Sequence, residues 1–278
     1  MLKKRVIAAI MVKDGLVVQS IGFERYLPVG KIDIAIEFLE HWDVDEIAII
    51  DIGATNNGNN IDFNSIKKAS KKCFLPISAG GGIDNIDTAR NILASGADKI
   101  IISSAAFTKP SFISECSEIF GDQSIVVCLD IKKMDNGEYR CFTHSGTIDT
   151  NISAIEFIEK NQNYGIGEIL INSIDQDGSK KGYDIELVKL IQNIATVPVI
   201  AMGGAGSFEH MSQVFKETGI SAVAAGNIFH FVEHSTAIAK AYLKNSDIPI
   251  RKSHILDYTG HIFDEFCRVT PYKFVDAI

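Results

Sequence analysis

The chain has 278 residues, of which 46% are hydrophobic, and its formal net charge is −8. The negative charge argues against binding to nucleic acid or to an anionic membrane surface, and no apolar run approaches the roughly 20 residues that span a bilayer. The length permits a single α/β barrel of about 250 residues as well as two smaller domains.

Short apolar runs rich in β-branched residues alternate with amphipathic stretches along the chain. We predict strands over residues 5–12, 46–51, 75–79, 99–103, 125–130, 168–173, 197–202 and 220–225. We predict helices over residues 32–41, 63–72, 86–95, 112–120, 154–161, 185–194, 209–218 and 232–245. Eight buried strands, each followed by a helix, predict an α/β fold in the form of a (βα)8 TIM barrel.

A doubly wound open sheet is the competing architecture, but it usually has fewer strands and one glycine fingerprint near its start. This chain has two glycine-rich strand exits about half a chain apart, in residues 75–83 and 197–206. Each is followed one strand later by an exit of small residues, in 99–107 and 221–229. The repetition predicts two half-barrels, and adjacent glycines with free backbone N–H groups suggest a ligand with a phosphate at each end.

Two segments interrupt the alternation of strands and helices. Residues 13–30 hold a turn followed by a polar stretch, and residues 132–150 are predicted to form a hairpin. Both follow the carboxyl end of a strand, where barrel enzymes carry their chemistry. We expect the barrel to fill residues 1–250, whereas the extension 251–278 shows weak helical patterning and no assignable role.

Carboxylates at the carboxyl ends of strands are the candidates for proton transfer. They are Asp51, Asp130, Asp175 and Asp177. Burial could raise the pKa of Asp130 into a useful range, but an aspartate at this position could equally cap the following turn. Asp175 and Asp177 lie in a turn-forming sequence, so their first expected role is structural.

Charged residues stand at the amino-terminal entry of four predicted strands. They are Arg5, Glu46, Lys99 and Glu168. If the strands close into a barrel, these two cations and two anions could meet in a ring across its lower opening. Charges at strand starts commonly only face water, and a buried ring is costly unless its charges pair with one another.

The cysteines are odd in number and contain no C-x-x-C pair. They are Cys73, Cys116, Cys128, Cys141 and Cys267. This pattern predicts reduced, mostly buried thiols of a cytoplasmic protein, with no metal site. The first residues lead directly into a strand, so we expect no signal sequence, and nothing in the sequence requires a cofactor.

Motifs spread over about residues 1–250 resemble the cyclase subunit of imidazole glycerol phosphate synthase, the (βα)8 barrel of the histidine pathway. They fall in the order and spacing of that family. They include Val12-Lys-Asp-Gly15, Ser78-Ala-Gly-Gly-Gly-Ile83, Phe142-Thr-His-Ser-Gly146, Ser173-Ile-Asp-Gln-Asp-Gly178 and Gly203-Gly-Ala-Gly206.

The resemblance implies a partner at one end of the barrel. In that family a glutaminase subunit docks on the amino-terminal face, and ammonia passes a charged gate and the barrel axis to reach a bisphosphate substrate. The gate positions correspond to the four strand-entry charges Arg5, Glu46, Lys99 and Glu168, and Asp98 corresponds to a contact with the glutaminase.

The resemblance also implies a catalytic site at the opposite end of the barrel. Asp130 occupies the position of one of the two acid–base aspartates of the family. Contacts to the phosphorylated substrate are expected from Asp51, Gly81, Gly82, Ser103, Ser104, Asn172, Asp177, Gly204, Gly226 and Asn227.

The catalytic end departs from the family pattern at five positions. Met11 replaces the second acid–base aspartate, and Gln19 replaces the lysine of a mobile loop. Ser103, Asn172 and Met202 stand where the family has asparagine, threonine and serine. A general acid or base typically contributes roughly 10²–10⁴-fold in rate, so we expect the standard cyclisation to be very slow.

An intact ammonia-receiving end beside an altered catalytic end resembles the cyclase-like paralogues found with surface-polysaccharide genes. Together with a glutaminase and a sugar amidotransferase, they are held to convert an acetamido group of a nucleotide sugar into an acetamidino group. We therefore expect a lyase-like subunit that serves lipopolysaccharide biosynthesis. The alternatives are an authentic histidine-pathway cyclase that uses Asp130 and water, and a non-catalytic scaffold that activates its glutaminase and delivers ammonia to another protein.

Overall fold

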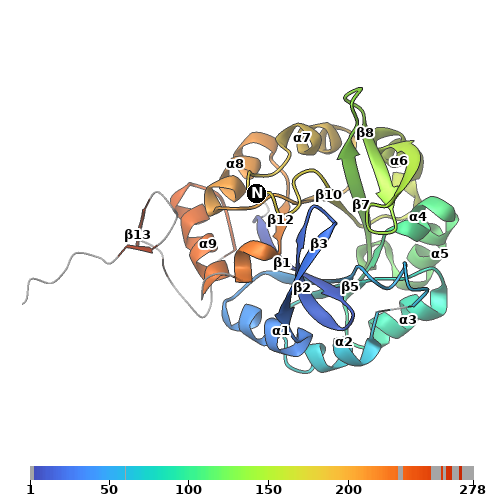
Figure 1. Cartoon of the computed structure of the whole chain (residues 1–278), viewed down its shortest axis with the longest axis horizontal. Helices are drawn as coiled ribbons and strands as arrows, with labels where there is room; N and C mark the ends of the chain where they lie inside the picture. Colours follow the sequence, from blue (N-terminus) through green and yellow to red (C-terminus); the bar gives the residue numbers. More distant parts are fainter. Residues whose placement is uncertain are drawn as a thin grey trace, which may run out of the picture.

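A computed structural model describes residues 3–59, 61–230, 234–251, 258, 261–264 and 269–270. Parallel strands form a closed barrel with helices around it (Figure 1). Around the barrel their order is β1 (Arg5–Lys13), β4 (Glu46–Asp51), β5 (Ile77–Gly80), β6 (Lys99–Ile102), β7 (Ile125–Lys133), β10 (Glu168–Ser173), β11 (Val199–Met202) and β12 (Ala222–Ala225). Because β12 pairs with β1 and β7 pairs with β10, the barrel prediction is confirmed and the open-sheet alternative is wrong.

Amphipathic helices cover the outside of the barrel. They are α1 (Ile32–His41), α2 (Phe63–Ser70), α3 (Ile86–Ala94), α5 (Ser111–Phe120), α6 (Ala154–Asn161), α7 (Ile185–Ile194), α8 (Phe208–Thr218) and α9 (Ser235–Asn245). Polar side chains fix several of their starts, because Asp62, Asn85, Ser153, Asp184 and Ser207 each accept a hydrogen bond from the first helical turn. The predicted helices are all present, although the predicted start of the last one, residue 232, lies outside the described residues. The short helix α4 (Ser104–Thr108) was not predicted.

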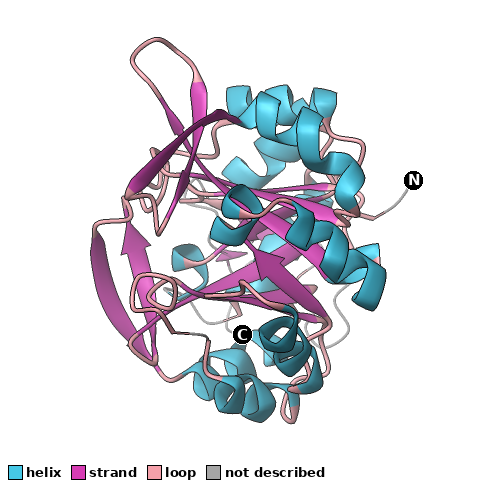
Figure 2. Cartoon of the chain, turned by 90° about the vertical axis from the view of Figure 1, so that its right-hand side faces the viewer, coloured by secondary structure: helices cyan, strands magenta, loops and turns pink. Residues whose placement is uncertain are grey.

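Both interruptions of the βα alternation add antiparallel strands at the carboxyl-terminal end of the barrel. In the first, β2 (Leu16–Ile21) pairs with β1 and with β3 (Arg25–Gly30). The expected polar stretch before Gly30 is therefore a strand. Its sequence lacks the alternation typical of a half-buried strand, because most of its side chains are exposed. In the second, β8 (Tyr139–Thr143) forms the predicted hairpin with β7, and an unpredicted strand, β9 (Ile148–Ser153), follows. Figure 2 shows these strands projecting beyond the ring of helices.

The described residues after α9 contact the rest of the fold at two places. Near the amino terminus, the backbone N–H of Lys4 donates to the carbonyl oxygen of Pro249 at 2.9 Å. Farther along, β13 (Ile262–Phe263) pairs with β14 (Val269–Thr270), and the Phe263 ring packs edge-on against Tyr242 of α9. The helix expected after residue 251 is wrong at Phe263, because this residue lies in strand β13. The other two residues of the helical pattern, Ile255 and Phe266, lie outside the described residues.

No helix in the described ranges is long and apolar enough to cross a membrane. The cysteines at positions 73, 116, 128 and 141 are buried and carry free thiols, whereas Cys267 lies outside the described residues.

Candidate functional site

A cavity of about 410 Å³ opens at the carboxyl-terminal ends of the barrel strands. This volume lies in the range of small-molecule sites in proteins. The structure brings together in its wall all the residues for which the sequence implies catalysis or substrate contact. These are Asp51, Gly81, Gly82, Ser103, Ser104, Asp130, Asn172, Asp177, Gly204, Gly226 and Asn227.

The two glycine-rich exits lie on opposite walls of this cavity. The pair β5 and β6 is separated from the pair β11 and β12 by two strands on either side of the barrel. Gly81 and Gly204 have φ angles of 135° and 98°, and a Cβ at Gly204 would overlap the carbonyl oxygen of Gly182. Only glycine suits such positions, and the bare backbone that results offers a cradle for an anionic group on each side.

Asp130 lies on the inner wall of the cavity, within β7. It does not cap a turn, because the strand continues beyond it to Lys133. Its Oδ1 accepts a hydrogen bond of 3.1 Å from Nδ2 of Asn172. Burial raises the pKa of Asp130 to about 7, against the effect of the Asn172 hydrogen bond and with a smaller contribution from the charge of Asp177. Asp130 can therefore hold or release a proton near neutral pH.

The raised pKa of Asp130 predicts a pH-dependent cost to stability. Because the folded chain binds this proton more tightly than the unfolded chain, for which the ordinary value is 3.8, ionisation costs stability. The cost is absent below the unfolded pKa and complete above the folded one. We expect Asp130→Asn to raise the free energy of unfolding by up to about 4 kcal/mol at pH 8, and by much less at pH 5.

Urea unfolding of Asp130→Asn and the wild-type chain at both pH values measures this difference. Asp84→Asn serves as the control, because Asp84 lines the same cavity but is exposed. An equal effect of Asp130→Asn at pH 5 and pH 8 would contradict the assigned pKa.

The other predicted polar residues of the cavity also hold its loops in place. Asp51 Oδ1 accepts hydrogen bonds from the backbone of the turn after β4, at 3.0 and 3.1 Å. Asp177 Oδ2 accepts from Ser20 Oγ at 2.6 Å and from the Phe23 backbone at 3.2 Å. Asn227 Nδ2 donates to the Ser20 carbonyl at 2.7 Å. Asp177 and Asn227, for which substrate contacts were expected, thus hold the β2–β3 turn at the rim. Burial raises the pKa of Asp177, and the hydrogen bonds that Asp177 accepts from Ser20 and Phe23 oppose that effect.

Residues of the two added hairpins also line the cavity. Ser20, Phe23 and Tyr26 had no expected role at the site, whereas His144 and Ser145 belong to the family-like motif Phe142–Gly146 but were assigned no role. A Cβ at Gly146 would lie 3.0 Å from the Phe23 ring, so the β2–β3 and β8–β9 turns approach each other over the cavity. Phe23 has a φ of 60°, which is rare for a bulky residue and which no local motif announces.

Met11 and Gln19, which were expected to replace a catalytic aspartate and a loop lysine, differ in their relation to the cavity. Met11 lines it from β1, the strand directly across the barrel from the β7 strand that carries Asp130. Gln19 lies on β2 opposite Leu27 of β3, and it is not among the lining residues. Among the described residues, no group of three or more His, Cys, Asp or Glu side chains is placed to hold a metal ion.

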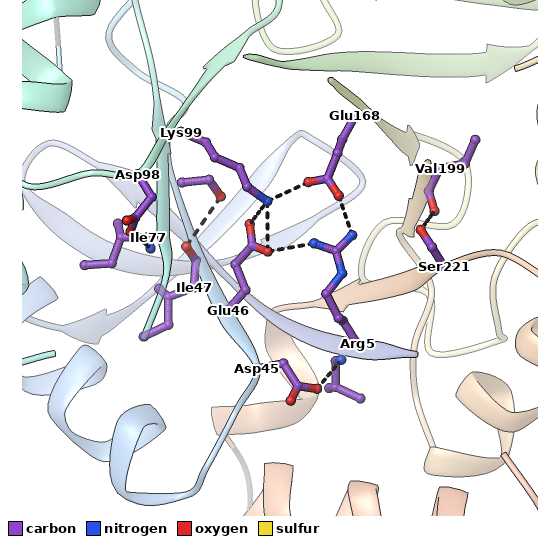
Figure 3. Close-up of polar contacts among 12 residues, drawn as sticks. Arg5, Asp45, Glu46, Ile47, Ile77, Asp98, Lys99, Glu168, Val199 and Ser221 are labelled. Carbon is purple, nitrogen blue, oxygen red and sulfur yellow. Dashed lines mark hydrogen bonds and ion pairs between the residues drawn. The ribbon is translucent and has the colours of Figure 1, made fainter. Parts of the chain in front are cut away.

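At the amino-terminal end of the barrel, Arg5, Glu46, Lys99 and Glu168 form a closed ring of alternating charges (Figure 3). Lys99 Nζ lies 3.1 Å from Glu46 and 2.7 Å from Glu168. Arg5 contacts Glu46 at 3.0 Å through Nη1 and contacts Glu168 through Nη2. We call these four side chains the charged ring.

The charged ring is largely withdrawn from water. Its side chains are between 4% and 17% exposed. Burial alone would raise the pKa of Glu168, but the charges of and hydrogen bonds from Arg5 and Lys99 lower it below its ordinary value. Mutual pairing thus offsets the cost of burying these charges. Asp98, beside Lys99, is exposed, and its Oδ2 accepts a 2.8 Å hydrogen bond from the backbone of Ile77.

The interior of the barrel between the charged ring and the cavity is lined by apolar side chains, and we call this region the bore. Inward-facing strand side chains form it as a cluster separate from the main core. They are Ile7, Ala9, Ala48, Ile101, Val126, Cys128, Leu170, Ile200, Met202, Ala222 and Ala224. Directly above the charged ring, a space of about 10 Å³ lies between Glu46 and bore residues, close to the smallest volume that holds one water-sized molecule. Ile101 lines both this space and the large cavity.

Known proteins resemble this chain along most of its length. A family model described as histidine biosynthesis protein matches residues 5–235. A Vibrio vulnificus protein provisionally named imidazole glycerol phosphate synthase subunit hisF2 is 40% identical over 264 residues, which cover 95% of this chain and 97% of the relative. The imidazole glycerol phosphate synthase subunit HisF of Chlorobium luteolum is 41% identical over 251 residues, which cover 90% of this chain and 100% of the relative. The Clostridium botulinum subunit of the same name is 40% identical over 253 residues.

Proposed function

Because this chain belongs to the histidine biosynthesis protein family, in which it resembles imidazole glycerol phosphate synthase subunits along most of its length, we propose that it is the synthase subunit of a glutamine amidotransferase complex. A glutaminase subunit docks on the amino-terminal face, near the charged ring and Asp98. Ammonia then moves along the bore to a phosphorylated ligand in the cavity. The observation that carries this proposal is the placement of charged ring, apolar bore and cavity on one axis.

The physical properties of each part suit the passage of ammonia. The charged ring closes the lower mouth of the barrel, so that entry requires its ion pairs to rearrange. The walls above it are apolar, and they favour neutral ammonia over ammonium because an unpaired charge in such surroundings is very costly. At the upper end, the two glycine cradles on opposite walls suit a ligand with an anionic group at each end.

We further propose that the chain has diverged from histidine synthesis toward amidination of a surface-polysaccharide sugar, with a sugar amidotransferase as an additional partner. The support is the chemistry of the cavity wall. Asp130 can transfer a proton near neutral pH, but Met11, on the facing strand, cannot. One of two acid–base groups is therefore absent from a site whose ligand cradles are intact.

An authentic cyclase of the histidine pathway is the second candidate. It is favoured by the names of relatives that are about 40% identical over at least 90% of this chain. In this alternative, Asp130 and a water molecule carry out the proton transfers that elsewhere need two aspartates.

Steady-state turnover of the phosphoribulosyl formimino bisphosphate substrate with ammonium salts separates the candidates. We expect a rate roughly 10²–10⁴-fold below that of an authentic cyclase assayed in parallel, since one general acid or base is missing. Asp130→Asn should abolish the remaining turnover. A wild-type rate equal to that of the authentic enzyme would refute the divergence. Stimulated glutaminase activity without turnover of any phosphorylated ligand would instead identify a non-catalytic scaffold.

A further inference from the structure

Asn172 carries a buried hydrogen-bond acceptor that faces no partner. The residue is 5% exposed, and its Nδ2 donates to Asp130. Its Oδ1 has no hydrogen-bond partner in the part of the chain that the structure describes. An unpaired buried polar atom costs about 1–3 kcal/mol, so one that lies in the wall of a cavity points to a ligand that donates to it.

The orientation of the Asn172 amide follows from its neighbours. An ionised carboxylate only accepts hydrogen bonds, so ionised Asp130 holds the Nδ2 side of the amide toward itself and turns Oδ1 away. On that side lies Gly203 of the cavity wall, where a Cβ would come within 3.3 Å of Oδ1. Because Gly203 has no side chain, no Cβ crowds Oδ1 on this side, although the oxygen itself is buried in this conformation.

Asn172 also stands at the upper end of the bore. Inward-facing residues alternate along a strand, and on β10 they are Glu168 of the charged ring, Leu170 of the bore and then Asn172. On the paired strand β7, the bore residues Val126 and Cys128 precede Asp130, which lies directly beside Asn172. A small molecule that moves up the bore therefore reaches Asn172 and Asp130 as the first polar groups on this wall.

We propose that Asn172 Oδ1 and the carboxyl group of Asp130 form a binding site for ammonia at the upper end of the bore. Ammonia has three N–H donors and one lone pair. Two acceptors on neighbouring strands would hold two of its N–H groups and leave the lone pair for the electrophile in the cavity. Asn172 is then a positioning residue, and this inference rests on the proposed passage of ammonia through the barrel.

The amide at position 172 suits this role better than a threonine side chain would. The amide separates its donor, which holds Asp130, from its acceptor, which remains for the ligand. A threonine hydroxyl would have to donate to Asp130 and accept from ammonia through one oxygen atom.

NMR of the full chain with ¹⁵N-labelled asparagine side chains tests the site without any acceptor substrate. Ammonium chloride is titrated at constant ionic strength, and tetramethylammonium chloride, which has the same charge but no N–H group, is the control probe. We expect a saturable shift of the Asn172 side-chain signals with ammonium chloride alone. Asn161, which is buried and donates to the carbonyl of Phe157 at 2.7 Å, is an internal control whose signals should stay in place.

The variant Asn172→Ala identifies the Asn172 signals by their absence, and it also tests the second acceptor. In the wild-type chain, the ¹³C signal of the Asp130 carboxyl should respond to ammonium chloride, and in Asn172→Ala this saturable response should be lost. No shift at Asn172, an equal shift with tetramethylammonium, or an unchanged response in Asn172→Ala would overturn the inference. Binding without cyclase turnover would leave the site standing and remove the cyclase assignment, whereas turnover without binding would remove only the site.

Discussion

Replacing Lys99 with alanine should uncouple glutamine hydrolysis from product formation in the complex with the glutaminase. Lys99 contacts both acidic residues of the charged ring, so its loss removes two ion pairs and leaves Glu46 and Glu168 to share Arg5. Removing one partner of a buried ion pair typically costs about 3–5 kcal/mol, enough to shift the equilibrium between a closed and an open charged ring by more than tenfold. Ammonia would then escape to solvent instead of entering the bore.

The measurement is the ratio of product formed to glutamate released, with the ammonium-driven reaction recorded in parallel. The ammonium-driven rate should stay near that of the wild type, because the cavity is unchanged. Lys72→Ala is the matched control: it removes a 2.9 Å ion pair with Glu37 in which both side chains are 49% exposed, and such pairs contribute little. Unchanged coupling in both Lys99→Ala and Arg5→Ala would remove the role assigned to the charged ring.

Restoring a carboxylate with Met11→Asp should raise the residual cyclase rate by roughly 10²–10⁴-fold, the usual contribution of a general acid or base. The expected gain follows from position, since Met11 lines the cavity on the strand that faces Asp130 across the barrel. Gln19→Lys alone should have little effect, because Gln19 does not line the cavity in this conformation. Combined with Met11→Asp, it should add to the rate if the β2–β3 hairpin moves during turnover.

Met202→Asp provides the matched control for this experiment. Met202 also lines the cavity, but on β11, so a carboxylate there does not face Asp130 in the same way. Its rate should not rise. The explanation by a missing acid–base group would fail if Met11→Asp folded normally without gaining rate, or if both variants gained equally.

Much of the barrel follows from local patterns in the sequence. Buried parallel strands read as short apolar runs, and each run here corresponds to a barrel strand with ends shifted by a few residues. The charged ring could be anticipated because its members enter their strands at equivalent points. The cavity residues could be anticipated because strand exits converge at one end of any such barrel.

The remaining features depend on contacts between distant segments. Asp177 and Ser20 are 157 residues apart, yet their hydrogen bond fixes a turn at the rim of the cavity. Strand β3 is exposed along most of its length, so it lacks the alternation that marks a half-buried strand. The free acceptor of Asn172 depends on the register of β10 against β7, which no single segment encodes.

Isotope competition tests most directly whether nitrogen travels inside the barrel. The wild-type complex receives glutamine labelled with ¹⁵N in its amide group, together with an excess of unlabelled ammonium chloride, and the ¹⁵N content of the product is measured. Passage through the charged ring and the bore predicts a product that keeps the glutamine label despite the excess in solution. A product with the isotope ratio of the bulk ammonium would show that nitrogen arrives from solvent, and it would contradict conduction through the barrel.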